Sequence, residues 1–266
     1  MEKRQIKKLA GNSQFIKGIY NYCDRWCERC PLTSRCLNFA FDSEESPDQE
    51  AHDINNEAFW QKLAETFRIT HELLEEAAAR EGIDLNSIDI DEFSREESLE
   101  DDLVENHECC RLAKLYSEMV SDWFESAKDL FEQEEDELNP AAELDMPEVS
   151  PVEEDRSFRE AVDVVRWYQY QIQVKLMKAA RGDLEERPEI LDEFSKDSDG
   201  MAKVALIGID RSIAAWGDLR NHFPLLSDDS LHILVQLDRL RRKVERAFPN
   251  ARVFIRPGFD RIDLNN

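Results

Sequence analysis

Residues 22–36 read YCDRWCERCPLTSRC and contain four of the six cysteines of the chain. Gaps of three, two and five residues separate these four cysteines, which are Cys23, Cys27, Cys30 and Cys36. A protein with free thiols has no reason to keep such a density of cysteine, whereas a metal centre needs it. The stretch therefore predicts a metal site with these four residues as ligands.

The spacing of the cysteines bears on which metal they bind. Four thiolates complete a tetrahedral zinc site or supply one ligand to each iron of a four-iron cluster. Structural zinc commonly uses two Cys-x-x-Cys pairs from separate parts of the chain, whereas only Cys27 and Cys30 form such a pair here. Pro31 follows Cys30, as in the cysteine–proline ending of bacterial ferredoxin motifs. The spacing favours a 4Fe–4S iron–sulfur cluster as the cofactor, with zinc as the alternative.

The surroundings of the cysteines also fit an anionic metal site. Aromatic side chains could shield it from water, and arginines could offset the negative charge of four thiolates. The aromatic residues are Tyr20, Tyr22, Trp26, Phe39 and Phe41, and the arginines are Arg25, Arg29 and Arg35.

The first three cysteines also match the spacing of radical S-adenosylmethionine enzymes, which leave one iron open to substrate. Cys36 is placed to close that fourth position. The sequence also lacks the alternating strands and helices that form the barrel of those enzymes. A closed site is therefore favoured over an open catalytic iron.

The chain is strongly acidic, with 59 acidic and 34 basic residues and a formal net charge of −25. Such a surface repels polyanions, so no nucleic-acid partner is expected. The exception is an N-terminal basic patch, which could dock on the acidic residues of the protein itself or on an acidic partner, or remain solvated. The patch consists of Lys3, Arg4, Lys7, Lys8 and Lys17.

The sequence also indicates the compartment. No segment approaches the roughly eighteen apolar residues of a membrane span, and the first 20 residues contain no apolar run of signal-peptide length. We therefore expect a cytoplasmic protein without a membrane partner. In that reducing compartment, metal binding is favoured over the alternatives of disulfides or free thiols.

The sequence divides into a cysteine-rich head at residues 1–41, an acidic linker at 42–56 and an acidic helical body at 57–266. In the body, apolar residues recur at spacings of three, four and seven, as on one face of a helix. The fold class expected is all-α, a multi-helix bundle with a small metal-binding head. The main helices are predicted at about 57–80, 99–135, 153–180, 200–219 and 228–248.

The predicted helices at 153–180 and 200–219 are apolar on several sides, which is typical of helices at the centre of a bundle, so we expect them to pack together. Gly182 is expected to end the former. Residues 83–98 are expected to form a loop. Residues 252–256 have strand composition without a visible partner strand, so we expect a short C-terminal extended segment.

Asp210 lies among apolar residues of the predicted helix 200–219, where a carboxylate is costly without a partner. Its candidate partners are Lys203, Arg211, and either Arg166 or Lys175 of the predicted helix 153–180. Two interpretations stay open, a buried ion pair that fixes helix register and a catalytic or ligand-binding pocket that includes Tyr168. The catalytic candidates are Asp210, Arg211, Lys203, Lys175 and Tyr168, and whether the chain is an enzyme stays open.

The helical body offers no second obvious set of metal ligands. A ferritin-like two-metal site needs Glu-x-x-His pairs, and the sequence has none. His71 and Glu75, at the edge of the apolar stripe of helix 57–80, are expected to face inward. Cys109 is expected in the core, and its neighbour Cys110 is interpreted as incidental.

The segments Tyr22–Pro31 and Ala205–Ser212 resemble an uncharacterised family of helical bacterial proteins with an N-terminal four-cysteine motif. The resemblance implies no known activity. The residues favour a metalloprotein that holds a 4Fe–4S cluster for electron transfer or redox sensing and has a redox partner or another protein partner. The alternatives are a zinc-structured protein-interaction module and an enzyme with a polar pocket between helices 153–180 and 200–219. The sequence leaves the oligomeric state open.

Overall fold

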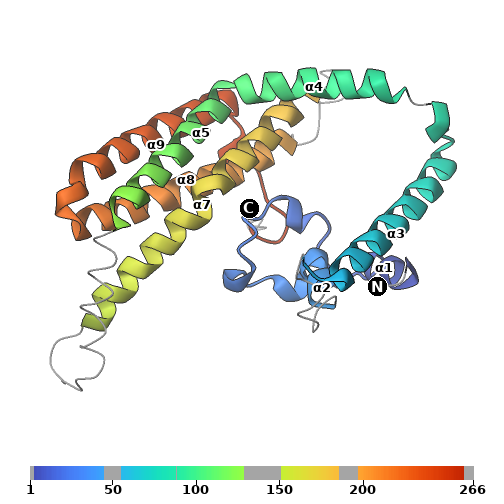
Figure 1. The fold of residues 1–266 in the computed structure, drawn as a ribbon, viewed down its shortest axis with the longest axis horizontal. Helices are drawn as coiled ribbons and strands as arrows, with labels where there is room; N and C mark the ends of the chain where they lie inside the picture. Colours follow the sequence, from blue (N-terminus) through green and yellow to red (C-terminus); the bar gives the residue numbers. More distant parts are fainter. Residues whose placement is uncertain (1–2, 45–54, 88, 129–150, 186–196, 261–266) are drawn as a thin grey trace, which may run out of the picture. The chain divides into compact units, whose positions relative to one another are not determined.

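The computed structural model describes residues 3–44, 55–87, 89–128, 151–185 and 197–260. Over these ranges the chain forms eight α-helices and no β-strand, which confirms the all-α prediction (Figure 1). No helix in the described part of the chain is long and apolar enough to cross a membrane. Contacts divide the chain into unit 1, residues 1–98 with 255–266, and unit 2, residues 99–254.

Unit 2 is built around four helices, α5 (Glu108–Ser126), α7 (Pro151–Glu185), α8 (Asp197–His222) and α9 (Ser227–Ala247). Helix α5 packs on α7, α7 on α8, α8 on α9, and α9 back on α5 (Figure 1). Each helix therefore has two neighbours, and their apolar faces enclose one core. This confirms the multi-helix bundle expected from the apolar periodicity.

Helices α7 and α8 pack together, as predicted for the segments 153–180 and 200–219. Their close approach depends on Gly208, because a Cβ atom there would lie 2.8 Å from Tyr168 Cδ1 and 3.1 Å from Ile172 Cγ1. The Arg211 guanidinium donates a hydrogen bond to the Tyr168 hydroxyl beside this contact. A glycine on α8 thus lets two large α7 side chains reach its backbone.

Replacing Gly208 by alanine is expected to lower the free energy of unfolding of unit 2 by about 1–3 kcal/mol, because the added methyl group overpacks this contact. Gly217→Ala is the matched control on the same helix, since a Cβ atom at Gly217 meets nothing within 4 Å. That control is expected to raise stability by about 0.5–1 kcal/mol through helix propensity. Urea unfolding followed by near-UV circular dichroism measures both. Equal effects of the two substitutions would contradict the packing argument.

Aromatic side chains fill the core of unit 2. The rings of Trp123 and Trp216 meet edge to face with centroids 4.9 Å apart. Trp216 Nε1 donates a hydrogen bond of 3.3 Å to the Tyr116 hydroxyl. Burial raises the pKa of Tyr116 to about 12, so the phenol stays neutral and serves as a structural hydrogen-bonding group.

Buried glutamine side chains tie the helices of unit 2 across its core. Gln169 on α7 donates to the Ser117 carbonyl of α5 at 2.9 Å. Gln236 on α9 donates to the Leu112 carbonyl, which also lies on α5, at 2.9 Å. Both carbonyls lie within α5, so these bonds fix the registers of α7 and α9 against one helix.

Several predicted boundaries were wrong, each for a local reason. Residues 83–98 are not a loop, since α4 (Ile90–Asn106) begins after Asp89, whose carboxylate accepts the Asp91 amide at 3.0 Å. The predicted helix 99–135 is broken because His107 caps a new helix, its Nδ1 accepting the Cys109 amide at 3.3 Å. Residues 129–135 of that prediction lie outside the described residues.

Two further predictions about segment ends were also wrong. Gly182 does not end its helix, because α7 continues to Glu185 and Gly182 packs against Ser198 of α8. The expected extended segment 252–256 begins instead as a 3-10 turn, Ala251–Val253. Burial of Phe254 and a hydrogen bond from the Lys203 ammonium to its carbonyl hold this turn on unit 2.

Unit 1 contains α1 (Lys3–Ala10), α2 (Leu37–Glu44) and α3 (Glu57–Glu81). Two residues of the N-terminal basic patch, Lys3 and Lys7, pair with acidic residues of α3. Lys3 Nζ lies 3.1 Å from Glu72 and 2.6 Å from Glu76, and Lys7 also pairs with Glu76. The hydrogen bonds from Lys3 and Lys7 lower the pKa of Glu76 to about 2. Ion pairs therefore attach α1 to one side of α3.

Helix α3 has the predicted extent and ends at Gly82, which adopts a left-handed φ of 72°. Of the apolar stripe predicted to face inward, Ala78 is buried, whereas Trp60, Phe67 and Leu74 are exposed. The α1 ion pairs and the buried Ile69 lie on another side of the helix. His71 and Glu75, expected to face inward, are exposed and pair with each other at 3.5 Å.

Candidate metal centre

The cysteine stretch connects α1 to α2 through three short 3-10 turns, Ile19–Asn21, Cys27–Arg29 and Thr33–Arg35. The first turn precedes Cys23, the second lies between Cys27 and Cys30, and the third lies between Cys30 and Cys36. The Ile16 amide donates to the Arg35 carbonyl at 3.0 Å and closes the loop around them. Four ligands close in sequence can therefore face one another in space.

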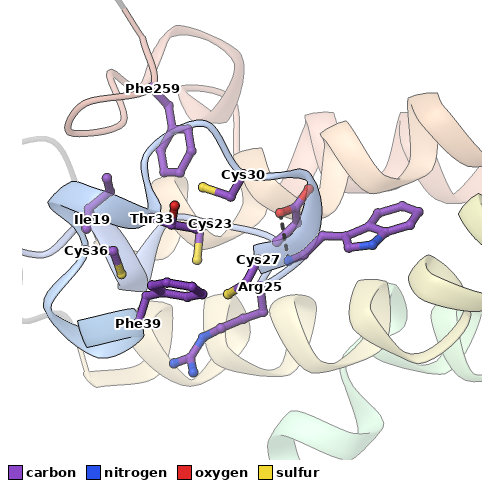
Figure 2. Close-up of a pocket in the computed structure, with 11 residues that line it drawn as sticks. Ile19, Cys23, Arg25, Cys27, Cys30, Thr33, Cys36, Phe39 and Phe259 are labelled. Carbon is purple, nitrogen blue, oxygen red and sulfur yellow. Dashed lines mark hydrogen bonds between the residues drawn. The ribbon is translucent and has the colours of Figure 1, made fainter. Parts of the chain in front are cut away.

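All four cysteines line one cavity of about 310 Å³ including its mouth (Figure 2). Cys23, Cys27, Cys30 and Cys36 are each partly exposed. Two of the aromatic residues expected around the site, Trp26 and Phe39, are in the lining. The other lining residues are Ile19, Asp24, Arg25, Thr33 and Phe259. The structure therefore brings together the four predicted ligands on a partly apolar surface.

The thiols influence one another electrostatically. The pKa of Cys27 is raised, first by burial and then by the charges of Cys23, Cys30 and Cys36. Four thiolates at these positions therefore repel one another unless a cation lies between them. Cys30 Sγ also accepts a hydrogen bond from the Leu32 amide at 3.4 Å, an interaction that stabilises a thiolate.

Arg25 shapes the loop between the first two cysteines. Its φ of 61° is the one positive value at a non-glycine residue among the described residues. Such left-handed backbone costs about 1–3 kcal/mol and is concentrated at functional sites. The Arg25 carbonyl accepts the Cys27 amide at 2.9 Å, so the turn brings Cys27 back toward Cys23. Nearby, the Arg29 guanidinium stacks 3.9 Å above the Trp26 ring.

A C-terminal segment completes the cavity, which the sequence analysis did not foresee. Figure 2 shows Phe259 of this segment and Phe39 of α2 among the residues that line the cavity with the four cysteines. Arg256 and Asp260 form an ion pair at 3.0 Å across this turn, and the Arg256 guanidinium lies 5.0 Å from the Phe259 ring centroid. The one available sequence signal was the Pro257–Gly258 pair, because Gly258 adopts a left-handed φ of 79°.

The donor set fits a metal group that thiolates bind. Sulfur ligands of this kind select zinc or iron–sulfur clusters. As the side chains stand, no three His, Cys, Asp or Glu residues of the described ranges form a group that could hold a metal ion. The cysteines are instead distributed around the wall of the shared cavity.

The structure distributes the catalytic candidates over separate contacts. Asp210 is partly exposed and pairs with Arg252, with Arg241 3.9 Å away, so its expected burial was wrong. Lys203 bonds the Phe254 carbonyl, and Arg211 bonds the Tyr168 hydroxyl. Lys175 is buried on α7. The Asp210 contacts are those of a surface ion-pair network, so the position gives no sign of a catalytic carboxylate.

Cys109 and Cys110 both lie in the core of unit 2, so Cys110 is not incidental. Burial raises the pKa of Cys109 to about 11 and that of Cys110 to about 12. These thiols stay protonated at neutral pH and pack as small apolar groups.

Above pH 9, the free energy of unfolding of unit 2 is expected to fall by about 1.4 kcal/mol per pH unit for each of these thiols. Unfolded thiols ionise near pH 9, whereas the folded ones keep their protons until about pH 11 to 12. The stability they contribute is therefore complete below pH 9 and is lost as the pH rises through the folded pKa values. Urea unfolding between pH 8 and 11 measures the slope. In the Cys109→Ser/Cys110→Ser variant, stability should fall only above about pH 10, where the unfolded Tyr116 phenol begins to ionise. A slope equal to that of the wild type would contradict the assignment of the effect to the two thiols.

Comparison of the chain with protein-family models, characterised proteins and solved structures gives no match. The resemblance of Tyr22–Pro31 and Ala205–Ser212 to a helical bacterial family therefore stays a prediction.

Proposed function

We propose that Cys23, Cys27, Cys30 and Cys36 hold a 4Fe–4S cluster used for electron transfer or redox sensing, in a cytoplasmic protein that exchanges electrons with a redox partner. The convergence of the four cysteines on one cavity carries the proposal. Four thiolates from one loop can supply one ligand to each iron, which leaves no iron open to a substrate. When bound, such a cluster would accept and release single electrons.

The residues around the cysteines support this use of the site. The Leu32 amide donates to Cys30 Sγ, and hydrogen bonds to the sulfurs are among the features that set a cluster potential. Trp26, Phe39 and Phe259 supply apolar walls that limit the access of water. The cysteines are nevertheless partly exposed, so the edge of the site is close enough to the surface for electron exchange with another protein.

A zinc-structured interaction module is the second candidate, and one observation favours it. Ile19 is the one buried residue among positions 3–41 of the described chain. A head with so small a core needs a disulfide, a metal or another cross-link to stay folded. A single structural zinc would meet that need as well as a cluster would.

Metal analysis of the full chain, purified and kept without air, separates the two candidates. The expected result is about four iron and four acid-labile sulfide per chain, with visible cluster absorbance. Colourless protein with about one zinc per chain would overturn the cluster in favour of the interaction module. A chain that binds neither metal, even after incubation with iron and sulfide or with zinc, would overturn both candidates.

A further inference from the structure

Helix α3 exposes a row of apolar side chains with a seven-residue repeat. Trp60, Phe67 and Leu74 are 53%, 66% and 54% exposed. Leu63, Thr70 and Ala77 lie three residues after each of them, which gives the a and d positions of a heptad pattern. Large apolar groups aligned in this way on an exposed helix mark an interaction surface. We call these six residues the α3 seam.

The α3 seam lies on a helix that is held in place by other parts of unit 1. The ion pairs from Lys3 and Lys7 of α1 reach Glu72 and Glu76, which are outside the seam. Both ends of α3 are capped, by the Asn56 side chain and by Gly82. These contacts hold α3 in its helical conformation without any packing against the α3 seam.

The polar member of the α3 seam can also be covered without loss of a hydrogen bond. The Thr70 hydroxyl donates to the Thr66 carbonyl of its own helix at 2.9 Å. Its methyl group remains available for packing. A partner helix could therefore cover Thr70 without leaving its hydroxyl donor unsatisfied.

We propose that the α3 seam pairs with the α3 seam of a second copy of this chain, with the two helices antiparallel. In an antiparallel pair, a positions of one helix face d positions of the other. The register that places Phe67 opposite Thr70 also places Trp60 opposite Ala77. It places Leu63 opposite Leu74. Each aromatic ring thus faces a small residue, and leucine faces leucine, which gives layers of similar volume.

A parallel pair would fit much less well. It would set Trp60 against Trp60 and Phe67 against Phe67 while leaving Ala77 opposite Ala77. Such layers alternate between overfilled and empty, and both defects are destabilising. The order of large and small residues along the seam therefore selects the antiparallel arrangement, which a twofold axis generates from two identical chains.

Charge next to the α3 seam also permits self-association, although the chain carries a net charge of −25. In the antiparallel register, the neighbouring e and g positions of the two copies meet without a pair of like charges. The facing pairs are Ala64 with His71, Phe59 with Arg80, and Thr66 with Leu73. Glu57 lies opposite Ala78, which is buried within its own chain. The dimer does not depend on a metal at the cysteine site.

Sedimentation equilibrium of the full chain over a wide concentration range tests the interface. A monomer–dimer equilibrium is expected, and Phe67→Glu should raise its dissociation constant by about 100-fold or more because a carboxylate is buried in the seam. Val235→Glu on α9 is the matched control, since Val235 is 60% exposed and outside the seam. A wild-type chain that stays monomeric, or a dimer that Phe67→Glu leaves intact, would overturn the proposal.

A volume exchange tests the antiparallel register. Trp60→Ala should weaken the dimer by about tenfold by leaving a cavity, and Ala77→Trp should weaken it similarly by overfilling the same layer. The double variant W60A/A77W recreates one large and one small residue in that layer, so affinity should return to within about threefold of the wild type. Far-UV circular dichroism confirms that α3 remains helical in each variant. Absence of rescue in the folded double variant would overturn the register.

Discussion

If the four cysteines hold the proposed cluster, replacing Cys27 by serine is expected to remove most of its iron from the protein. Burial and then the charges of the other three cysteines raise the pKa of Cys27, so this proposed ligand lies within their electrostatic reach. A serine hydroxyl stays protonated at neutral pH and cannot replace a thiolate ligand, and three cysteines then leave one iron without its protein ligand. Iron and sulfide content and visible absorbance, measured on anaerobic protein, should fall by about tenfold or more.

Cys110→Ser is the matched control for this experiment. It also removes one thiol from the chain, but Cys110 is buried in unit 2 and does not line the cysteine cavity. Its metal content should equal that of the wild type, although unit 2 loses some stability. Full metal content in Cys27→Ser, or equal loss in the two variants, would contradict the assignment of ligands.

Replacing Gly258 by valine is expected to destabilise unit 1 by about 3 kcal/mol and to speed the release of the proposed metal group. Gly258 has a φ of 79°, which a β-branched residue adopts only with strain. A Cβ atom there would also lie 2.7 Å from Ile16 Cδ1 and 3.3 Å from Ile19 Cδ1. The C-terminal segment would therefore lose its place over the cavity, and Phe259 with it. Chelator-induced release of iron, followed by absorbance, should be faster than in the wild type.

Gly82→Val separates backbone strain from packing. Gly82 has a φ of 72°, but a Cβ atom there meets nothing within 4 Å. This control should lower the stability of α3 while leaving metal release at the wild-type rate. If both glycine variants released metal equally, the contact of Gly258 with Ile16 and Ile19 would have no special importance for the site.

The sequence was sufficient to predict features that depend on neighbouring residues. The spacing of Cys23, Cys27, Cys30 and Cys36 indicated one common site, because short turns between close cysteines leave few other arrangements. The apolar periodicity predicted the approximate extents of α3, α7, α8 and α9, although α7 continues past the expected end at Gly182 to Glu185. Boundaries failed where one side chain caps a helix, as Asp89 and His107 do.

Asp210 and Phe259 show what periodicity could not predict. Asp210 was expected to be buried because its sequence neighbours are apolar, but the 3-10 turn at Ala251–Val253 brings Arg252 to it at the surface. Phe259 is 223 positions from Cys36 and reaches the cavity only through the folding of the C-terminal segment. Both contacts join residues that are distant in sequence, and no local pattern encodes them.

The sequence by itself therefore determined the all-α fold class, the approximate positions of the main helices and the identity of four candidate ligands. These features follow from residue spacing, helix propensity and thiol chemistry, all of which act over a few neighbouring positions. Only the tertiary structure decided that the C-terminal segment closes the cysteine cavity and that the apolar row of α3 is exposed within unit 1. Those features depend on which surfaces cover one another, and burial is set by packing between distant segments of the chain.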